Sequence, residues 1–175
     1  MTDQHFPASK TTPMVGIIMG SDSDLSVMQA AADALKSFGI PCEMTVASAH
    51  RSPARAADYA ATARERGLKT IIAGAGHAAH LAGVLAAHTT LPVIGVPIDS
   101  SCLKGWDALL ATVQMPPGIP VATMAIGKSG ARNAGIFAAQ MIALADPDLS
   151  RKLDDFKDKM AEQVAEKARK IENAQ

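Results

Sequence analysis

The stretch VGIIMGSDSD, residues 15–24, contains the pattern that recurs along the chain. Its first five residues are apolar without interruption, which is typical of a parallel strand that is covered on both faces. The glycine, hydroxyl and carboxylate residues that follow mark the turn into a helix, which we expect to end at Gly39. The stretch therefore predicts a buried strand followed by a crossover helix.

Similar apolar runs occur at residues 42–47, 70–73, 93–96 and 121–126, and helical patterns lie between them. Ser52 and Pro53, for instance, read as an N-cap and a first-turn proline, and Gly67 should end that helix. Because parallel strands need helical, right-handed crossovers, this alternation predicts an α/β domain with a doubly wound parallel sheet of about five strands.

The last segment has a different character. Asp146 and Pro147 begin a new helix, and apolar residues then recur every three or four positions from Leu149 to Ile171. At 1.5 Å per residue this helix would be roughly 40 Å long, more than the width of such a domain. We therefore predict a flexible tail at residues 1–13, a catalytic α/β domain at 14–146, and a helix at 147–175 that packs on neighbouring subunits. A helix that wraps its own domain is the alternative.

Composition excludes several classes of protein. The 175 residues suit one domain, and 17 Lys and Arg balance 17 Asp and Glu, so no overall charge favours nucleic acid or an anionic membrane. Two cysteines are too few for a disulfide framework, and no secretory signal or membrane-spanning run is present. We expect a cytoplasmic protein that acts on a small molecule.

Open α/β sheets bind ligands at the carboxyl ends of their strands, and there the sequence places its reactive residues. The GSDSD segment, residues 20–24, offers N–H groups and hydroxyls to a phosphate, while Asp24 suits ribose hydroxyls. Plain helix capping by Ser21 or Ser23 explains the same residues equally well. After the second strand, His50 is suited to proton transfer near neutral pH and Arg51 to anion binding.

The segment GAGHAAH, residues 74–80, also matches the dinucleotide-binding pattern G-x-G-x-x-A, with Asp99 after the next strand. Pro97 and the position on the third strand weigh against that interpretation. His80 is either a core-facing helical residue or a substrate ligand, whereas His77 is expected to be structural or exposed. No His, Cys, Asp or Glu trio has metal-ligand spacing, so we expect no metal.

Six motifs taken together carry a family resemblance: MGSDSD, SAHRSP, AGAGHAAHL, LPVIGVP, VQMPPGIPV and AIGKSGARNA. In this order, over about residues 14–146, they resemble the N5-carboxyaminoimidazole ribonucleotide mutases of purine biosynthesis. The resemblance implies a three-layer α/β/α fold of the flavodoxin-like or Rossmann-like type, a homo-octamer, and C-terminal helices packed against neighbouring subunits. It implies a reaction without a metal or an organic cofactor. It also implies a functional coupling to the ATP-dependent synthetase that makes the carbamate.

The resemblance also assigns roles to single residues. His50 matches the catalytic histidine, which moves a proton while a carboxylate passes from the exocyclic nitrogen to carbon 4 of the imidazole. The expected substrate-binding residues are Ser21, Ser23 and Arg51 at the phosphate, Asp24 at the ribose, Ser48, Gly76 and His80 near the imidazole and the migrating carboxylate, and Leu81 in the pocket wall.

Two positions depart from the family pattern, because His77 replaces a glycine and Ala82 a proline. The added imidazole is expected to alter the pH dependence, and loss of the proline to loosen the loop. A direct CO2-dependent aminoimidazole ribonucleotide carboxylase is the nearest rival, although Arg51 and the glycines at 74 and 76 favour the mutase. An NAD-dependent oxidoreductase and a non-catalytic nucleotide-binding module are the more distant alternatives.

Overall fold

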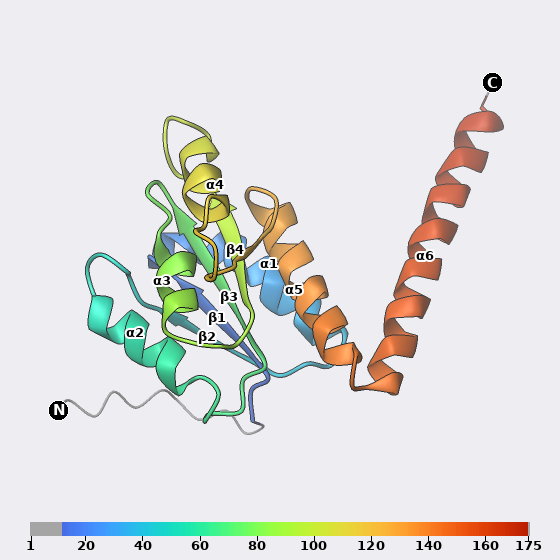
Figure 1. Ribbon diagram of the computed structural model, residues 1–175. Coiled ribbons are helices and arrows are strands. Elements are labelled where there is room, and N and C mark those ends of the chain that lie inside the picture. Colours follow the sequence, from blue (N-terminus) through green and yellow to red (C-terminus); the bar gives the residue numbers. More distant parts are fainter. Residues whose placement is uncertain (1–11, 175) are drawn as a thin grey trace. The chain divides into compact units, whose positions relative to one another are not determined.

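The computed structural model describes residues 12–174 of the chain. Its centre is a five-stranded parallel sheet in the order β2-β1-β3-β4-β5 (Figure 1). The strands are β1 (Val15–Met19), β2 (Cys42–Val46), β3 (Thr70–Gly76), β4 (Val93–Ile98) and β5 (Ala122–Thr123). This order is the flavodoxin-like one, in which the chain changes direction across the sheet between β1 and β3. The predicted doubly wound parallel sheet is confirmed.

Helices cover both faces of the sheet (Figure 1). They are α1 (Leu25–Ser37), α2 (Pro53–Thr62), α3 (Leu81–Ala87), α4 (Trp106–Val113) and α5 (Lys128–Ala143), with a short 3-10 helix η1 (Asp22–Asp24) before α1. On one face, α2 and α3 pack over alternate residues such as Ile71 and Ala73 of β3. On the other face, Met28 of α1 packs against Gly74, where a Cβ atom would overlap its side chain. The three-layer arrangement is therefore confirmed.

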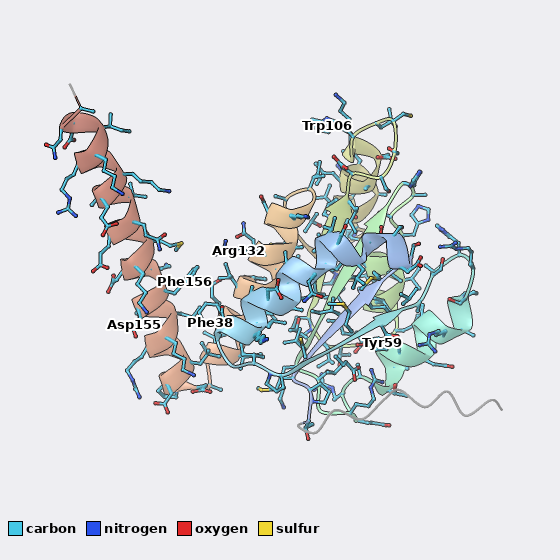
Figure 2. All side chains as sticks on the ribbon, turned by 180° about the vertical axis from the view of Figure 1, so that it is seen from behind. Phe38, Tyr59, Trp106, Arg132, Asp155 and Phe156 are labelled. Atoms are coloured by element: carbon cyan, nitrogen blue, oxygen red, sulfur yellow. The ribbon has the colours of Figure 1, made fainter. Side chains whose placement is uncertain are left out.

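Tyr59 shows how closely a helix approaches the sheet. It lies on α2 (Figure 2) and is fully buried. Its hydroxyl occupies the space that a side chain on Gly16 of β1 would need. The Arg66 guanidinium lies 4.5 Å from the centre of the Tyr59 ring and 3.0 Å from a Glu43 carboxylate oxygen. These contacts fix α2, and with it the segment that leads from β2 into the helix.

Some element boundaries differ from the prediction. α2 ends at Thr62 rather than at Gly67, because a turn follows and Gly67 closes that turn with a φ of 94°. Ser52 precedes α2 as predicted, but its hydroxyl accepts from the Ser48 backbone N–H at 2.9 Å instead of capping the helix. Gly39 follows α1 with a φ of 78°, as a helix-ending glycine should.

The chain divides into two compact units, residues 1–138 and 139–175. The second contains α6 (Pro147–Glu172), 26 residues long, whose Asp146 N-cap carboxylate accepts from the Asp148 and Leu149 backbone N–H groups. The predicted long helix and its start are thus confirmed, whereas its packing on another subunit stays a prediction. The predicted tail lies mostly outside the described residues. Within residues 12–174, no helix has the length and apolar character needed to cross a membrane.

Candidate functional site

A cavity of about 410 Å³ lies at the carboxyl ends of four strands, where the direction of the chain changes between β1 and β3. Open α/β sheets place their ligands at such an edge. Four of the five strands contribute, because β1 to β4 all end beside it. The lining residues are Gly20, Ser21, Ser23, Asp24, Ser48, Ala49, His50, Arg51, Ala75, Gly76, His77, Ala78, Leu81 and Ser100.

Asp24 is the buried carboxylate of this cavity, with 6% of its surface exposed. It follows Ser21, whose hydroxyl accepts from the Ser23 backbone N–H at 3.4 Å and so begins η1. Burial raises the pKa of the Asp24 carboxyl above its usual range, while hydrogen bonds from the Ser21 backbone and the Ser23 side chain partly oppose that rise. A buried acceptor therefore faces the cavity at an energetic cost to the fold.

Replacing Asp24 by Asn should raise the melting temperature at neutral pH. The folded state binds the Asp24 proton more tightly than the unfolded state, since burial raises the pKa of the carboxyl. The protonated Asp24 carboxyl therefore stabilises the native protein in acid, and this contribution is lost as the pH rises through the raised pKa. Asparagine at residue 24 does not titrate, so the variant does not lose stability in this way. In thermal unfolding from about pH 4 to about pH 8, the melting temperature of the variant should exceed that of the native protein by an amount that grows with pH. Asp58→Asn, at an exposed position on α2, is the matched control; a gap that is constant or reversed at neutral pH contradicts the prediction.

Arg51 joins the ends of β1 and β2. Its Nη2 atom donates to the carbonyl oxygen of Gly20 at 3.0 Å, and its backbone N–H donates to the Ser48 hydroxyl at 3.2 Å. The guanidinium has five N–H donors in a planar fork, so these bonds leave donors for a bound anion. Because Ser21 and Ser23 lie at the same end of the cavity, this end is suited to a phosphate group.

His50 and His80 form a hydrogen-bonded pair of imidazoles, although 30 residues separate them in the sequence. Nε2 of His50 lies 2.8 Å from Nδ1 of His80, and the two rings meet edge to face at 87°. One nitrogen of this bond must carry the proton and the other must accept it, so the bonded pair cannot be fully protonated. His50 therefore has a neighbour with which it can exchange a proton.

Gly76, His77 and Ser100 form the wall at the ends of β3 and β4. A Cβ atom on Gly76 would overlap the Ser100 hydroxyl, so the serine side chain lies directly against the Gly76 backbone. The same hydroxyl lies 3.0 Å from Nδ1 of His77. His77 itself has a φ of 53°, in the left-handed region that glycine adopts most easily.

The structure brings nearly all the predicted site residues together. Eight of them line the cavity, and His80, which is not part of the lining, reaches it through its bond to His50. Ala78 lines the cavity beside Leu81, whereas Ala79 is buried at 2% exposure and does not. Ser100 was not among the predicted site residues, and His77 was predicted to be structural or exposed. His77 is exposed, but it is exposed into the cavity; the signal was the shared strand-end position of both residues.

The glycine pattern at 74–79 does not form a dinucleotide-binding turn. Gly74 and Gly76 are both residues of β3, and α3 begins only at Leu81. In that fingerprint the glycines lie in the turn between strand and helix, where they approach a pyrophosphate. Within residues 12–174, no three His, Cys, Asp or Glu side chains are grouped so that they could hold a metal ion.

The chain is similar to known proteins over most of its length. The family model described as AIR carboxylase matches residues 14–163. The N5-carboxyaminoimidazole ribonucleotide mutase of Thermotoga maritima is 54% identical over 160 residues, which are 91% of this chain and 92% of that one. The enzyme of the same name from Bacillus subtilis is 57% identical over 154 residues, 88% of this chain and 95% of its own. The crystal structure of Treponema denticola PurE aligns with a TM-score of 0.79 at 26% identity, over 88% of this chain and 95% of that one. The chain therefore belongs to the AIR carboxylase family.

Proposed function

We infer that this chain is an isomerase of purine biosynthesis, which converts N5-carboxyaminoimidazole ribonucleotide into 4-carboxy-5-aminoimidazole ribonucleotide. The observation that carries this inference is the cavity in which the His50–His80 pair, Arg51 and the buried Asp24 meet. The reaction needs a group that moves a proton, a site for a phosphate and an acceptor for ribose hydroxyls, and these residues supply them. The high identity to relatives named for this reaction supports the same conclusion.

The nucleotide extends across the strand ends from β2 towards β4. Its 5′-phosphate binds Arg51 and the hydroxyls of Ser21 and Ser23, where donors are concentrated. The ribose hydroxyls donate to Asp24. The imidazole then lies near Ser48, Gly76 and the His50–His80 pair, with Leu81 in the apolar wall beside it.

His50 moves the proton in both halves of the reaction. In the first half, the bond between the exocyclic nitrogen and the carboxylate carbon breaks, CO2 leaves, and the nitrogen takes a proton from His50. In the second half, carbon 4 of the ring attacks CO2, and the hydrogen on that carbon passes as a proton to His50. His50 returns to its starting state, so the isomerisation consumes no other reactant. His80, 2.8 Å away, stabilises whichever protonation state His50 holds.

CO2 has to remain beside the ring between the two halves. The side chains of Ala49, Ala78 and Leu81 line the cavity and offer no polar group that could add to CO2. A site of this kind keeps the released molecule near carbon 4 because it lowers the local water content.

An isotope-labelling experiment tests the proposed function. The carbamate substrate, labelled with ¹³C in its carboxylate, is given to the protein in a buffer containing unlabelled bicarbonate. We expect product in which the label is largely retained, and activity that does not depend on the bicarbonate concentration. Product formed from aminoimidazole ribonucleotide only when bicarbonate is added would instead identify a direct carboxylase. Nucleotide binding with no turnover of either substrate would identify a binding module. Saturable binding of NAD would identify an oxidoreductase.

Assembly and cellular context are further parts of the proposal. We propose a homo-octamer, and exposed apolar side chains support contact between subunits, because such side chains mark contact surfaces when they cluster. In α4 and the loop before it these are Leu103, Trp106, Leu110 and Val113, and Figure 2 shows Trp106 on this part of the surface. In α6 they are Met160, Val164 and Ile171. Light scattering of the protein in solution measures the assembly. We place the enzyme in the cytoplasm, functionally coupled to the synthetase that supplies the carbamate.

A further inference from the structure

His77 has a backbone conformation that needs an explanation. Among the residues that the structure describes, only His77 and Lys104 combine a side chain with a positive φ, at 53° and 52°. Such conformations are disfavoured for residues with a Cβ atom, and they persist where the surroundings impose them, often at functional sites. In the case of His77, the conformation turns an imidazole into the cavity wall.

Ser100 holds the His77 ring in one orientation. Its hydroxyl is 3.0 Å from Nδ1 of His77, and its own position is restricted because the side chain lies against Gly76. With Nδ1 engaged, Nε2 is the ring atom that His77 can offer to a ligand. When Nδ1 accepts from the serine hydroxyl, Nε2 of the neutral imidazole carries the N–H and can donate it to a ligand.

The position of His77 matches one end of the bound nucleotide. Arg51, which we assign to the phosphate, follows β2, whereas His77 and Ser100 follow β3 and β4, on the other side of β1. Among the lining residues in the described chain, Arg51 is the one Arg or Lys side chain. The nucleotide carries two anions, a phosphate and a carboxylate, and since Arg51 is assigned to the phosphate, the carboxylate needs donors other than Arg51.

We propose that His77, held by Ser100, is a binding residue for the carboxylate of the nucleotide, through a hydrogen bond from Nε2. This inference rests on the proposed function and adds a recognition residue to it. In the family pattern that the chain resembles, this position is a glycine, whereas this chain has His77. The role is recognition of the carboxylated nucleotides, separate from the proton transfer at His50.

A hydrogen bond to a carboxylate is charge-assisted, because the acceptor is ionised. Loss of the His77 N–H should therefore weaken the binding of carboxylated nucleotides and leave that of uncarboxylated ones unchanged.

The test compares two ligands that differ by the carboxylate. Calorimetry measures the Kd of 4-carboxy-5-aminoimidazole ribonucleotide and of aminoimidazole ribonucleotide, which lacks the carboxylate, for the native protein and for His77→Gly. Glycine accepts the φ of 53°, so the variant should fold with an unchanged or higher melting temperature. We expect the variant to bind the carboxylated ligand about tenfold more weakly, and the other ligand equally well. Its KM should rise while kcat stays within about threefold.

Two further variants separate recognition from backbone effects. Ser100→Ala keeps the imidazole but removes its partner, and it should lose part of the same selectivity. Lys104→Gly relieves the same backbone conformation at a residue outside the cavity lining, so it should change neither ligand's Kd. An equal loss for both ligands in His77→Gly, or no loss for either, overturns the proposal. If the native protein binds and converts neither nucleotide, the proposed function fails instead, which the native protein alone reveals.

Discussion

Replacing His50 by Asn should lower kcat by more than ~100-fold, while the nucleotide continues to bind. Asparagine keeps a polar side chain, although it extends only about as far as Nδ1 of the imidazole, and it cannot give or take a proton near neutral pH. The hydrogen bond to His80 at 2.8 Å also loses its role in proton exchange, because an amide has no second protonation state to offer. Steady-state turnover of the carbamate substrate and the Kd of the product, measured side by side, report the two effects separately.

His88→Asn is the matched control for this experiment. His88 is exposed and follows α3 outside the cavity lining, so its replacement should leave kcat unchanged. Turnover of the His50→Asn variant within a few-fold of the native value would contradict the proton-transfer role. A loss of nucleotide affinity as large as the loss of kcat would assign His50 to binding instead.

Replacing Arg51 by Lys should raise KM by about 10- to 100-fold while kcat falls only a few-fold. Lysine keeps the positive charge but has no planar fork, so it cannot hold both the Gly20 carbonyl oxygen and a phosphate in the same geometry. Because the phosphate is remote from the reacting carbon, weaker contacts to it reduce the binding of the substrate and of the transition state by the same amount. The measurement is the dependence of rate on substrate concentration.

Arg64→Lys provides the control for the loss of an arginine fork. Arg64 donates to the Thr90 hydroxyl at 2.9 Å outside the cavity lining, so this variant should keep the native KM. A proportional drop in kcat with an unchanged KM in Arg51→Lys would contradict phosphate binding. It would place the guanidinium at the reacting groups instead.

The sheet was predictable because its strands carry a local signal. The apolar runs at β1 and β2 correspond to the observed strands within a residue, and Asp146 with Pro147 marks the start of α6. Boundaries that depend on tertiary contacts were less predictable. α2 ends five residues before Gly67, and the hydroxyl of Ser52 binds the Ser48 backbone rather than the helix end. β5 includes only residues 122–123 of the predicted 121–126.

The candidate site was predictable wherever strand-end position was sufficient. Ser21, Asp24 and Arg51 all follow strands whose carboxyl ends had to meet, so their convergence needed only the sheet order. Side-chain pairs across the sequence were not predictable in this way. The bond between His50 and His80 and the contact between Ser100 and His77 depend on loop conformations, which no local pattern in the sequence encodes.

The contact of Ser100 with Gly76 restricts the order in which these positions can evolve. An alanine at residue 76 would overlap the Ser100 side chain and also lie close to the Ile98 carbonyl oxygen, so loss of the Ser100 side chain reduces the cost of that substitution without removing it. That first change would release the His77 ring, which Ser100 holds at 3.0 Å. The three residues therefore form an epistatic group, in which the effect of one substitution depends on the identity of the other two. A substitution at Gly76 should therefore cost less stability when a change at Ser100 precedes it.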